Sequence, residues 1–233
     1  MNLKENVEFV KERIENARLR SGNKTAVKII AITKTHPASV IADIKECGID
    51  SIGENRVQEA DDKFTRIPNL IPMITKRLVG HLQSNKINKA ITIFDTIDSV
   101  DSLSLASKIG SKSFSKGKNT PILLEVNTSG ESAKFGFDPE NIDDMLACFE
   151  ISNIVLSGLM TIGPLTSDRK QIRTSFQKLR EIKHVLKSQS IKNNTNFNEL
   201  SMGMSGDFEL AIEEGATMVR LGTVLFGQRG QYR

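Results

Sequence analysis

The chain has 233 residues, of which 38% are hydrophobic and 26% are charged, and its formal net charge is +4. This composition is ordinary for a folded globular protein, and the length suffices for one large α/β domain or two small ones. The positive charge is mild and is not concentrated in one block, which argues against nucleic-acid binding. We find neither a signal peptide nor an apolar run long enough to cross a bilayer, so a cytoplasmic location is expected.

Apolar runs of strand length alternate with helix-like segments along the chain. An amphipathic segment over roughly 2–20 predicts an N-terminal helix. The predicted strands follow near residues 27–33, 49–53, 76–80, 93–97, 121–127, 154–160, 198–202 and 217–221. The predicted helices lie between them, near residues 38–47, 55–66, 83–91, 100–112, 139–149, 168–188 and 206–214.

Eight strands that alternate with helices predict an α/β fold, a closed (β/α)8 barrel of the TIM type. The runs "PILLEVN" and "IVLSGLM" lack a polar face, as expected of strands that are covered on both sides. An open doubly wound sheet is the alternative, but no G-x-G-x-x-G motif follows the first strand. We therefore expect a single domain over residues 1–233, with an N-terminal helix at 1–22 and the barrel at 27–229.

Polar, small and ionisable residues follow most of the predicted strands. The segments are "TKTHP", "GENRVQE", "GHLQSNK", "NTSGESAKFGF", "MTIGP", "SMGMSGDFE" and "RLGTVLFG". The opposite ends of the strands look plain by comparison. Because barrels of this type place their working face at the carboxyl ends of the strands, the asymmetry predicts a binding site there.

The last two strand ends have the residues of a phosphate site. Barrels often bind phosphate with the loops after strands seven and eight and with the N-terminus of a short helix. Here "LSMGMS" offers Ser201, Gly203 and Ser205, and "RLGTVLFG" offers Gly222 and Thr223. Glycine lets the backbone approach an anion closely, and amides and hydroxyls then bind its oxygens. The alternative is that Gly222 and Thr223 form only a turn with a helix cap.

Two cations interrupt apolar strands at the same end. Arg220, in "ATMVRLGTVLF", cannot lose its charge and so needs partners, either an acid such as Glu54 or Glu125 or a ligand. Lys34 follows the first apolar run and would neighbour Arg220, because strands one and eight pair in a closed barrel. A desolvated amine beside another cation reacts with aldehydes, and pyridoxal 5'-phosphate (PLP) is a phosphorylated aldehyde. The alternative is an ordinary lysine whose amine reaches solvent.

Six blocks of sequence, spread from about residue 27 to residue 229, occur in an order typical of one family. The blocks are "AITKTHP", "IGENRVQEADDK", "GHLQSNK", "LLEVNTSGESAKFGF", "LSGLMTIGP" and "LSMGMSGDFELAIEEGATMVRLGTVLFGQR". Together they resemble the pyridoxal phosphate homeostasis protein family. That family shares the barrel of the alanine racemase N-terminal domain, known as fold type III.

The resemblance implies specific roles for five of the residues at the strand ends. It implies that Lys34 carries PLP covalently, as an internal aldimine (a Schiff base). It also implies that Ser201, Gly222 and Thr223 bind the phosphate and that Arg220 contacts the pyridine nitrogen.

Two further residues match blocks that line the cofactor in the family. These are Asn55 in "GENRVQE" and His81 in "GHLQSNK". Asn55 could instead cap the following helix, and His81 could be a structural imidazole. Lys86 and Lys134 could hold a second anion or remain solvated. No metal site is predicted, because the three histidines lack metal-ligand spacing.

The same residues argue against robust catalysis. Arg220 at the pyridine nitrogen would keep that nitrogen unprotonated, which weakens the ring as an electron sink. Racemisation in the manner of alanine racemase also needs a second base, a tyrosine that an added β domain and a dimer partner supply. The single tyrosine of this chain is Tyr232, near its end.

We therefore expect a protein that binds PLP and acts in intracellular vitamin B6 homeostasis and cofactor supply. A weak PLP-dependent racemase or lyase is one alternative, and a barrel that binds an unrelated sugar phosphate is another. The expected partners are PLP and apo-enzymes that use it, with neither nucleic acid nor membrane among them. Because the dimerising β domain is missing, a monomer is expected.

Overall fold

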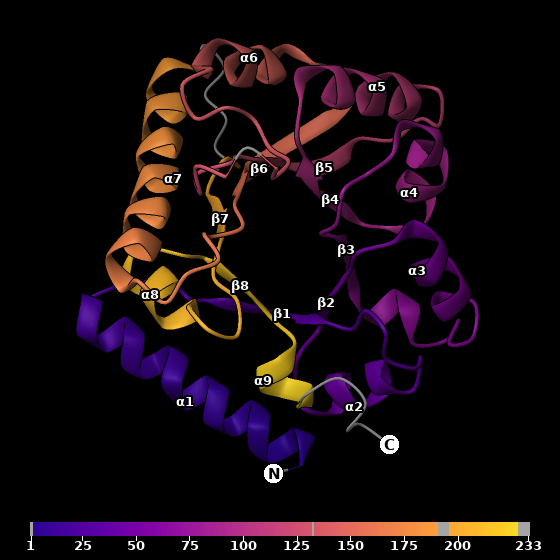
Figure 1. Ribbon diagram of the computed structural model, residues 1–233. Helices are drawn as coiled ribbons and strands as arrows, with labels where there is room; N and C mark the ends of the chain where they lie inside the picture. The colour runs from indigo at the N-terminus through magenta and orange to yellow at the C-terminus, as the bar shows by residue number, and fades with distance from the viewer. Residues whose placement is uncertain (1, 132, 191–195, 228–233) are drawn as a thin grey trace.

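In the computed structural model, residues 2–131, 133–190 and 196–227 are described. Within these residues, eight parallel strands form a closed barrel in sequence order, with helices around the outside (Figure 1). The strands are β1 Lys28–Ile32, β2 Ser51–Glu54, β3 Thr75–Leu78, β4 Thr96–Val100, β5 Thr120–Glu125, β6 Ile154–Met160, β7 Glu199–Ser201 and β8 Met218–Leu221. Because β1 pairs with β8, the predicted (β/α)8 barrel is confirmed and the open-sheet alternative is wrong.

Helices connect the strands and surround the barrel. They are α1 Leu3–Ser21, α2 Val40–Glu46, α3 Val57–Phe64, α4 Ile87–Ile93, α5 Leu103–Phe114, α6 Ile142–Ala147, α7 Arg169–Gln189, α8 Phe208–Glu213 and α9 Thr223–Phe226. In the described part of the chain, three short 3-10 helices lie within the connections: Ile71–Met73, Ser84–Lys86 and Cys148–Glu150.

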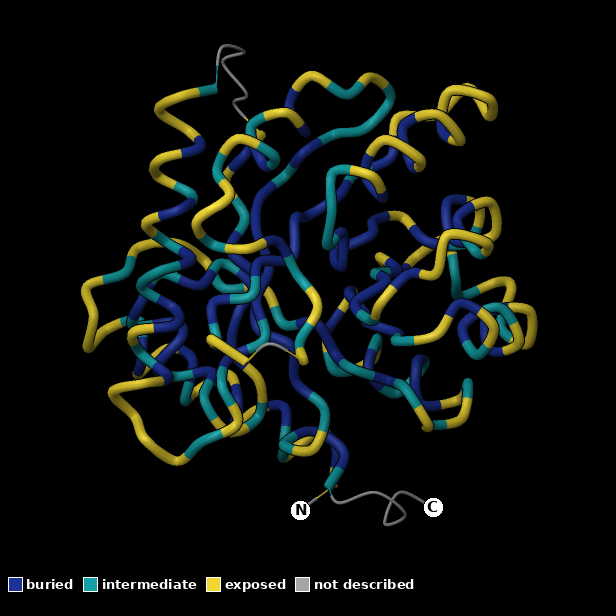
Figure 2. The backbone as a smooth tube through the Cα atoms, turned by 45° about the horizontal axis from the view of Figure 1, so that its top comes forward, coloured by how far each residue is buried: buried dark blue, intermediate teal, exposed yellow. Residues whose placement is uncertain are grey.

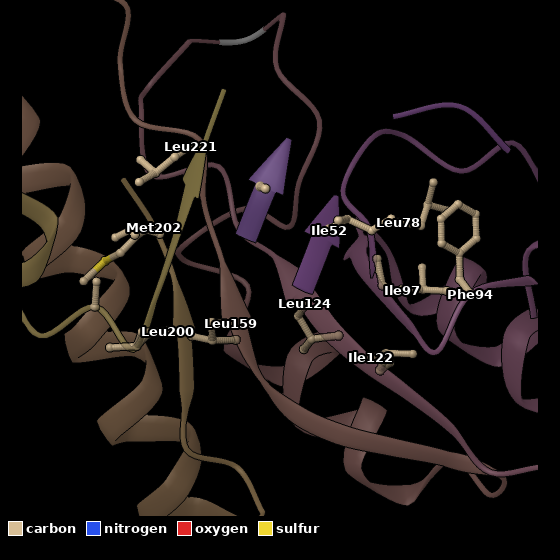
Figure 3. Packing of buried hydrophobic residues seen from close by; sticks show 14 of the residues in the cluster. Ile52, Leu78, Phe94, Ile97, Ile122, Leu124, Leu159, Leu200, Met202 and Leu221 are labelled. Atoms are coloured by element: carbon tan, nitrogen blue, oxygen red, sulfur yellow. The ribbon is translucent and has the colours of Figure 1, made fainter. Parts of the chain in front are cut away.

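Side chains on the strands alternate between the barrel interior and the surrounding helices. Ile30, Leu123, Met160 and Met218 form an inner cluster. The outward side chains belong to a larger core between strands and helices (Figure 3); among them are Ile52, Leu78, Ile97, Leu124, Leu159, Leu200 and Leu221. The barrel strands are therefore largely buried, whereas the surrounding helices keep an exposed face (Figure 2).

Ion pairs also occupy inward-facing strand positions. Arg77 of β3 donates twice to Asp98 of β4, from Nε at 2.7 Å and from Nη2 at 3.1 Å. Lys28 of β1 and Glu199 of β7 are joined by an Nζ–Oε1 contact of 2.7 Å. The barrel interior is thus not purely apolar: the buried Asp98 has an opposite charge as its partner, as buried charges require, whereas Lys28 is exposed at the open end of the barrel.

α1 precedes the barrel and lies along α8 and α9. A capping box between Asn2 and Glu5 begins the helix. One face is buried at helical spacing and consists of Leu3, Val7, Val10, Ile14 and Ala17. The side-chain amide of Asn6 donates to the carbonyl oxygen of Leu225 at 2.8 Å. α1 therefore supports the short helix that follows β8.

A close backbone contact joins β6 to β7 at Gly158. A Cβ atom at Gly158 would lie 2.0 Å from the carbonyl oxygen of Glu199, a distance that real Cβ atoms do not adopt. The register between β5 and β6 shifts beside this residue, between Ile122 and Leu123. Glycine is therefore required here by the approach of the neighbouring strand.

Among the described residues, the helices include none with the length and apolar character that a membrane span needs. In the same part of the chain, no cluster of three or more His, Cys, Asp or Glu side chains is arranged to hold a metal ion. Cys47 and Cys148 are both free thiols.

Candidate functional site

The loop between β1 and α2 carries Lys34, two residues beyond the end of β1. Lys34 is half-buried, and the next residue, Thr35, has a left-handed backbone with φ of 67°, which is uncommon outside glycine. The amide of His36 donates to the carbonyl oxygen of Thr33 at 3.1 Å. The His36 ring centroid lies 4.5 Å from that of Phe226 in α9. The loop is therefore a tight turn that packs against the helix following β8.

Arg220 is buried where the ends of β6, β7 and β8 meet. Its Nη1 donates to the carbonyl and hydroxyl oxygens of Ser201, at 2.7 and 2.9 Å. Its Nη2 donates to the carbonyl oxygen of Thr161 at 2.7 Å. In the strand register, Arg220 pairs with Ile30 of β1. A permanent positive charge therefore lies beside the strand that leads to Lys34.

The acids proposed as partners of Arg220 have different positions. Glu54 shares the outward side of β2 with Ile52 and pairs with Lys63 of α3 at 2.5 Å, so the suggested pairing of Glu54 with Arg220 is wrong. Glu125 shares the inward side of β5 with Leu123. Burial raises the pKa of Glu125 to about 7, against the opposing charge of Arg220. Of the two acids considered from the sequence, Glu125 is therefore the one that interacts with Arg220.

Burial also lowers the pKa of Arg220 itself, an effect that the negative charges of Glu125, Asp98 and Asp207 oppose. A cavity of about 180 Å³ lies beside Glu125 and is lined by Phe135 and Ile162. Because an arginine keeps its charge in proteins, these acids and the surrounding carbonyl oxygens stabilise the cation in place.

Two backbone amides converge on one oxygen at the start of α9. The amides of Gly222 and Val224 both donate to the hydroxyl of Ser205, at 3.3 and 3.2 Å. Gly222 is the N-cap of α9 and Thr223 is its exposed first residue. The helix-cap alternative is therefore compatible with a phosphate site, because cap amides are the groups that an anion contacts. A Cβ atom at Gly222 would lie 3.7 Å from Ile32, so this turn also adjoins β1.

Asn55 is half-buried and directly follows β2. The N-cap of α3 is Arg56, so the alternative that Asn55 caps this helix is wrong. A Cβ atom at Gly80, after β3, would lie 2.4 Å from the carbonyl oxygen of Asn55. The strand ends of β2 and β3 are therefore in direct contact at this residue.

His81 lies on the β3 side of the barrel end. Its Nδ1 is 2.9 Å from Oδ2 of Asp101, and its ring stacks on Phe135 with centroids 3.9 Å apart and planes 15° apart. These contacts match the structural-imidazole alternative. The structure thus brings Lys34, Arg220 and the start of α9 together across β1 and β8, whereas the described contacts of His81 connect it to the ends of β4 and β5.

A second cavity, of about 750 Å³, lies between the β5–α6 loop and α7, outside the predicted cofactor residues. Lys134 lines it, and the Lys134 amine donates to Glu131 at 2.7 Å and to the carbonyl oxygen of Gly163 at 2.8 Å. Lys86, the other lysine considered for a second anion, is half-buried at the N-cap of α4. Tyr232, the only tyrosine, lies outside the described residues.

Four residues at or near the site were not found from the sequence. Thr161 contributes a carbonyl oxygen, which no residue type signals. Phe135 stacks on His81 from a distant loop. Lys63 and Glu59 are four residues apart, a spacing that is also typical of an exposed helix face, although Lys63 is buried.

The family described as "Alanine racemase, N-terminal domain" matches residues 2–230 of this chain. A curated relative from Aquifex aeolicus, named pyridoxal phosphate homeostasis protein, is 39% identical over 231 residues. That alignment covers 98% of this chain and 99% of the relative.

Solved structures share the barrel. The structure of PipY from Synechococcus elongatus with PLP bound has a TM-score of 0.79 and 38% sequence identity, and covers 93% of this chain and 99% of that chain. Alanine racemase from Clostridium difficile has a TM-score of 0.76 at 16% identity, and covers 97% of this chain and 61% of that chain. The second comparison concerns the fold alone.

Proposed function

This chain belongs to the pyridoxal phosphate homeostasis protein family, and from this membership we propose that it binds PLP at the carboxyl end of its barrel. The observation that carries the proposal is the pairing of β1 with β8. Through this pairing, the strand that leads to the Lys34 loop runs beside the strand that contains the buried Arg220, and the loop packs through His36 on the helix whose first amides converge on one oxygen. An amine, a cation and an oxyanion site are the three groups that a phosphorylated pyridine aldehyde requires.

The phosphate fits the start of α9. The amides of Gly222 and Val224 already donate to a hydroxyl oxygen, so a phosphate oxygen could accept from them instead. Ser201 is the last residue of β7, and Thr223 follows β8 as the first residue of α9. Their hydroxyls complete the proposed set of phosphate donors. The bound phosphate fixes the distance of the ring from Lys34.

The pyridine nitrogen is assigned to Arg220. The described hydrogen bonds use three of the five guanidinium N–H groups, and one of the others serves the ring. When bound, PLP supplies a reactive aldehyde and an electron-withdrawing ring. Arg220 donates to the ring nitrogen without protonating it, which favours holding the cofactor over amino-acid chemistry.

Lys34 is proposed to hold the cofactor covalently through its amine. Ile30 and Ile32 of β1 face the barrel interior, and Lys34 is half-buried in the turn that directly follows this strand. Asn55 lines the ring from the end of β2. We assign His81 a more distant role, in which it fixes the rim through Asp101 and Phe135.

The covalent assignment is tested by borohydride reduction of protein incubated with PLP, followed by peptide mass spectrometry. We expect the mass of the reduced cofactor on the peptide that contains Lys34 in the wild type and no such label in Lys34→Ala. Lys86→Ala, which removes another half-buried lysine, is the matched control and should keep the label. Equal labelling of the wild type and Lys34→Ala would refute the assignment.

The proposed role is to hold PLP and supply it to apo-enzymes, as a monomer and without robust catalysis. Deuterium exchange at the α-carbon of a panel of amino acids should not exceed that given by PLP alone. An apo-enzyme added to the loaded protein should gain activity as the protein loses its absorbance. Deuterium exchange well above the background given by PLP alone would favour the racemase or lyase alternative. Light scattering tests the oligomeric state and should give the mass of one chain.

A further inference from the structure

A buried ionic network lies behind the Lys34 loop, between the outer face of the barrel and α3. The Lys63 amine is its centre, with only 5% of its side chain exposed. It donates to Glu54 Oε1 at 2.5 Å, to the carbonyl oxygen of Thr33 at 2.8 Å and to Glu59 Oε1 at 3.3 Å. The Thr33 hydroxyl donates to Glu54 Oε1 as well, at 2.6 Å.

The network holds the chain on both sides of Lys34. The carbonyl of Thr33 belongs to the peptide unit that precedes Lys34, and it accepts from Lys63. The amide of Thr35 belongs to the peptide unit that follows, and it donates to Glu59 Oε1 at 2.5 Å. Because peptide units are planar, fixing both of them fixes the direction in which the Lys34 side chain leaves the backbone.

The same contacts stabilise an unfavourable backbone conformation. Thr35 has φ of 67°, and a β-branched residue in this region is a genuine outlier. Such strain persists only where the surroundings over-determine it. The contact between Thr35 and Glu59 supplies that constraint, and Glu59 in turn is held by Lys63.

Stability alone is a poor explanation for this network. A buried ion pair is often no more stabilising than apolar residues of the same volume. Glu54 is fully buried, yet its Oε2 atom has no hydrogen-bond partner, and buried polar atoms of this kind are rare. Burial raises the pKa of Glu54, and Lys63 opposes this shift. The network therefore keeps the charges of Glu54 and Lys63 in a buried position, where desolvation is unfavourable, and in contact with the Lys34 loop.

We propose that Glu59 and Lys63 are positioning residues that aim the Lys34 amine at the cofactor aldehyde, with Glu54 holding Lys63 in place. This inference rests on the proposed function, because it presupposes that Lys34 binds PLP. Neither Glu59 nor Lys63 contacts the cofactor in this scheme. They act through the backbone on either side of Lys34.

The test uses Glu59→Ala, which removes the acceptor of the Thr35 amide from a side chain that is 29% exposed. Asp62→Ala is the matched control, because Asp62 is an exposed acid on the same helix whose carboxylate accepts from Gln58. We expect the rate of reducible PLP attachment to Lys34 to fall at least fivefold in Glu59→Ala and to stay unchanged in Asp62→Ala. Glu59→Gln should restore most of the rate, since its amide oxygen can still accept from Thr35.

A second measurement needs no cofactor. Amide hydrogen exchange of Thr35, followed by NMR in the apo protein, should quicken at least tenfold in Glu59→Ala but not in Asp62→Ala. If Glu59→Ala attaches PLP at the wild-type rate, or if Thr35 exchange does not change, the positioning proposal is wrong. If the wild type attaches no PLP while Thr35 exchange responds as expected, the proposed function is wrong and the constraint on the loop stands.

Discussion

The raised pKa of a single residue, Glu125, is expected to make the stability of the protein depend on pH. Burial raises its pKa from 4.5 to about 7, so the folded protein holds this proton more tightly than the unfolded chain does. The contribution to stability is therefore complete below pH 4.5 and is lost as the pH rises through 7. Its size over that window is up to about 3 kcal/mol, at 1.36 kcal/mol per pKa unit.

Replacing Glu125 by glutamine should remove this pH dependence. The free energy of unfolding of the wild type, relative to Glu125→Gln, is expected to fall by up to about 3 kcal/mol between pH 4.5 and pH 8. Urea denaturation at a series of pH values measures it, with the exposed Glu12→Gln as control. Parallel pH profiles for wild type and Glu125→Gln would show that Glu125 is ionised normally in the folded protein.

Arg220→Lys tests whether the planar guanidinium is needed. A lysine amine keeps the charge but cannot reach both Ser201 and Thr161 with the same geometry. We expect a loss of about 2 to 4 kcal/mol in the free energy of unfolding, because a buried hydrogen-bonded charge loses part of its partners and at least one acceptor loses its donor from Arg220. Arg169→Lys, at an exposed position on α7, should change it by less than about 0.5 kcal/mol. Equal stabilities of the two variants would contradict the role of these hydrogen bonds.

At this scale the sequence reveals residues with unusual chemistry but not their partners. Arg220 stands out because a cation interrupts an apolar strand, and its position among the strand ends is confirmed. Thr161 could not be found, because it acts through a carbonyl group that every residue has. Lys63 could not be found either, since a lysine four residues after a glutamate is typical of an exposed helix face.

The close backbone contact between β6 and β7 leaves no room for a side chain at Gly158. Gly158→Ala would place a Cβ atom 2.0 Å from a carbonyl oxygen of the adjacent strand, so the strands must separate. We expect a loss of at least about 3 kcal/mol in the free energy of unfolding, or failure to fold. Gly206→Ala is the matched control, because nothing lies within 4 Å of its added methyl group. Thermal denaturation compares the two, and a similar melting temperature for both would rule out the contact.

The predicted elements agree well with the structure where strand and helix patterns are separate. β4 is the largest discrepancy among the strands: the sequence predicts a strand near 93–97, and the structure places it at Thr96–Val100. The apolar letters of "ITIF" belong mostly to the end of α4. The strand itself contains Asp98, which reads as a loop residue because its partner Arg77 is on another strand. Local pattern cannot reveal a charge that is paired across the barrel.

Ligand binding should stabilise the whole barrel, because the proposed site joins its first and last strands. At a PLP concentration one hundred times the dissociation constant, the stabilisation is about 2.7 kcal/mol. For a chain of this size, the melting temperature should rise by about 5 to 10 °C. Differential scanning calorimetry measures the shift, and Lys34→Ala should lose most of it. A full shift in Lys34→Ala would mean that PLP binds without this lysine.

The pairing of β1 with β8 also has a consequence for the protein as it is synthesised. A ribosome adds β1 and the Lys34 loop early and adds β8, which contains Arg220, near the end, so a growing chain has the Lys34 amine long before it has the rest of the proposed site. An unfinished or clipped chain that stops before β8 has neither the buried cation nor the α9 amides. If the proposed site is correct, cofactor binding would therefore distinguish completed polypeptides from fragments; the barrel itself can close only after translation of β8.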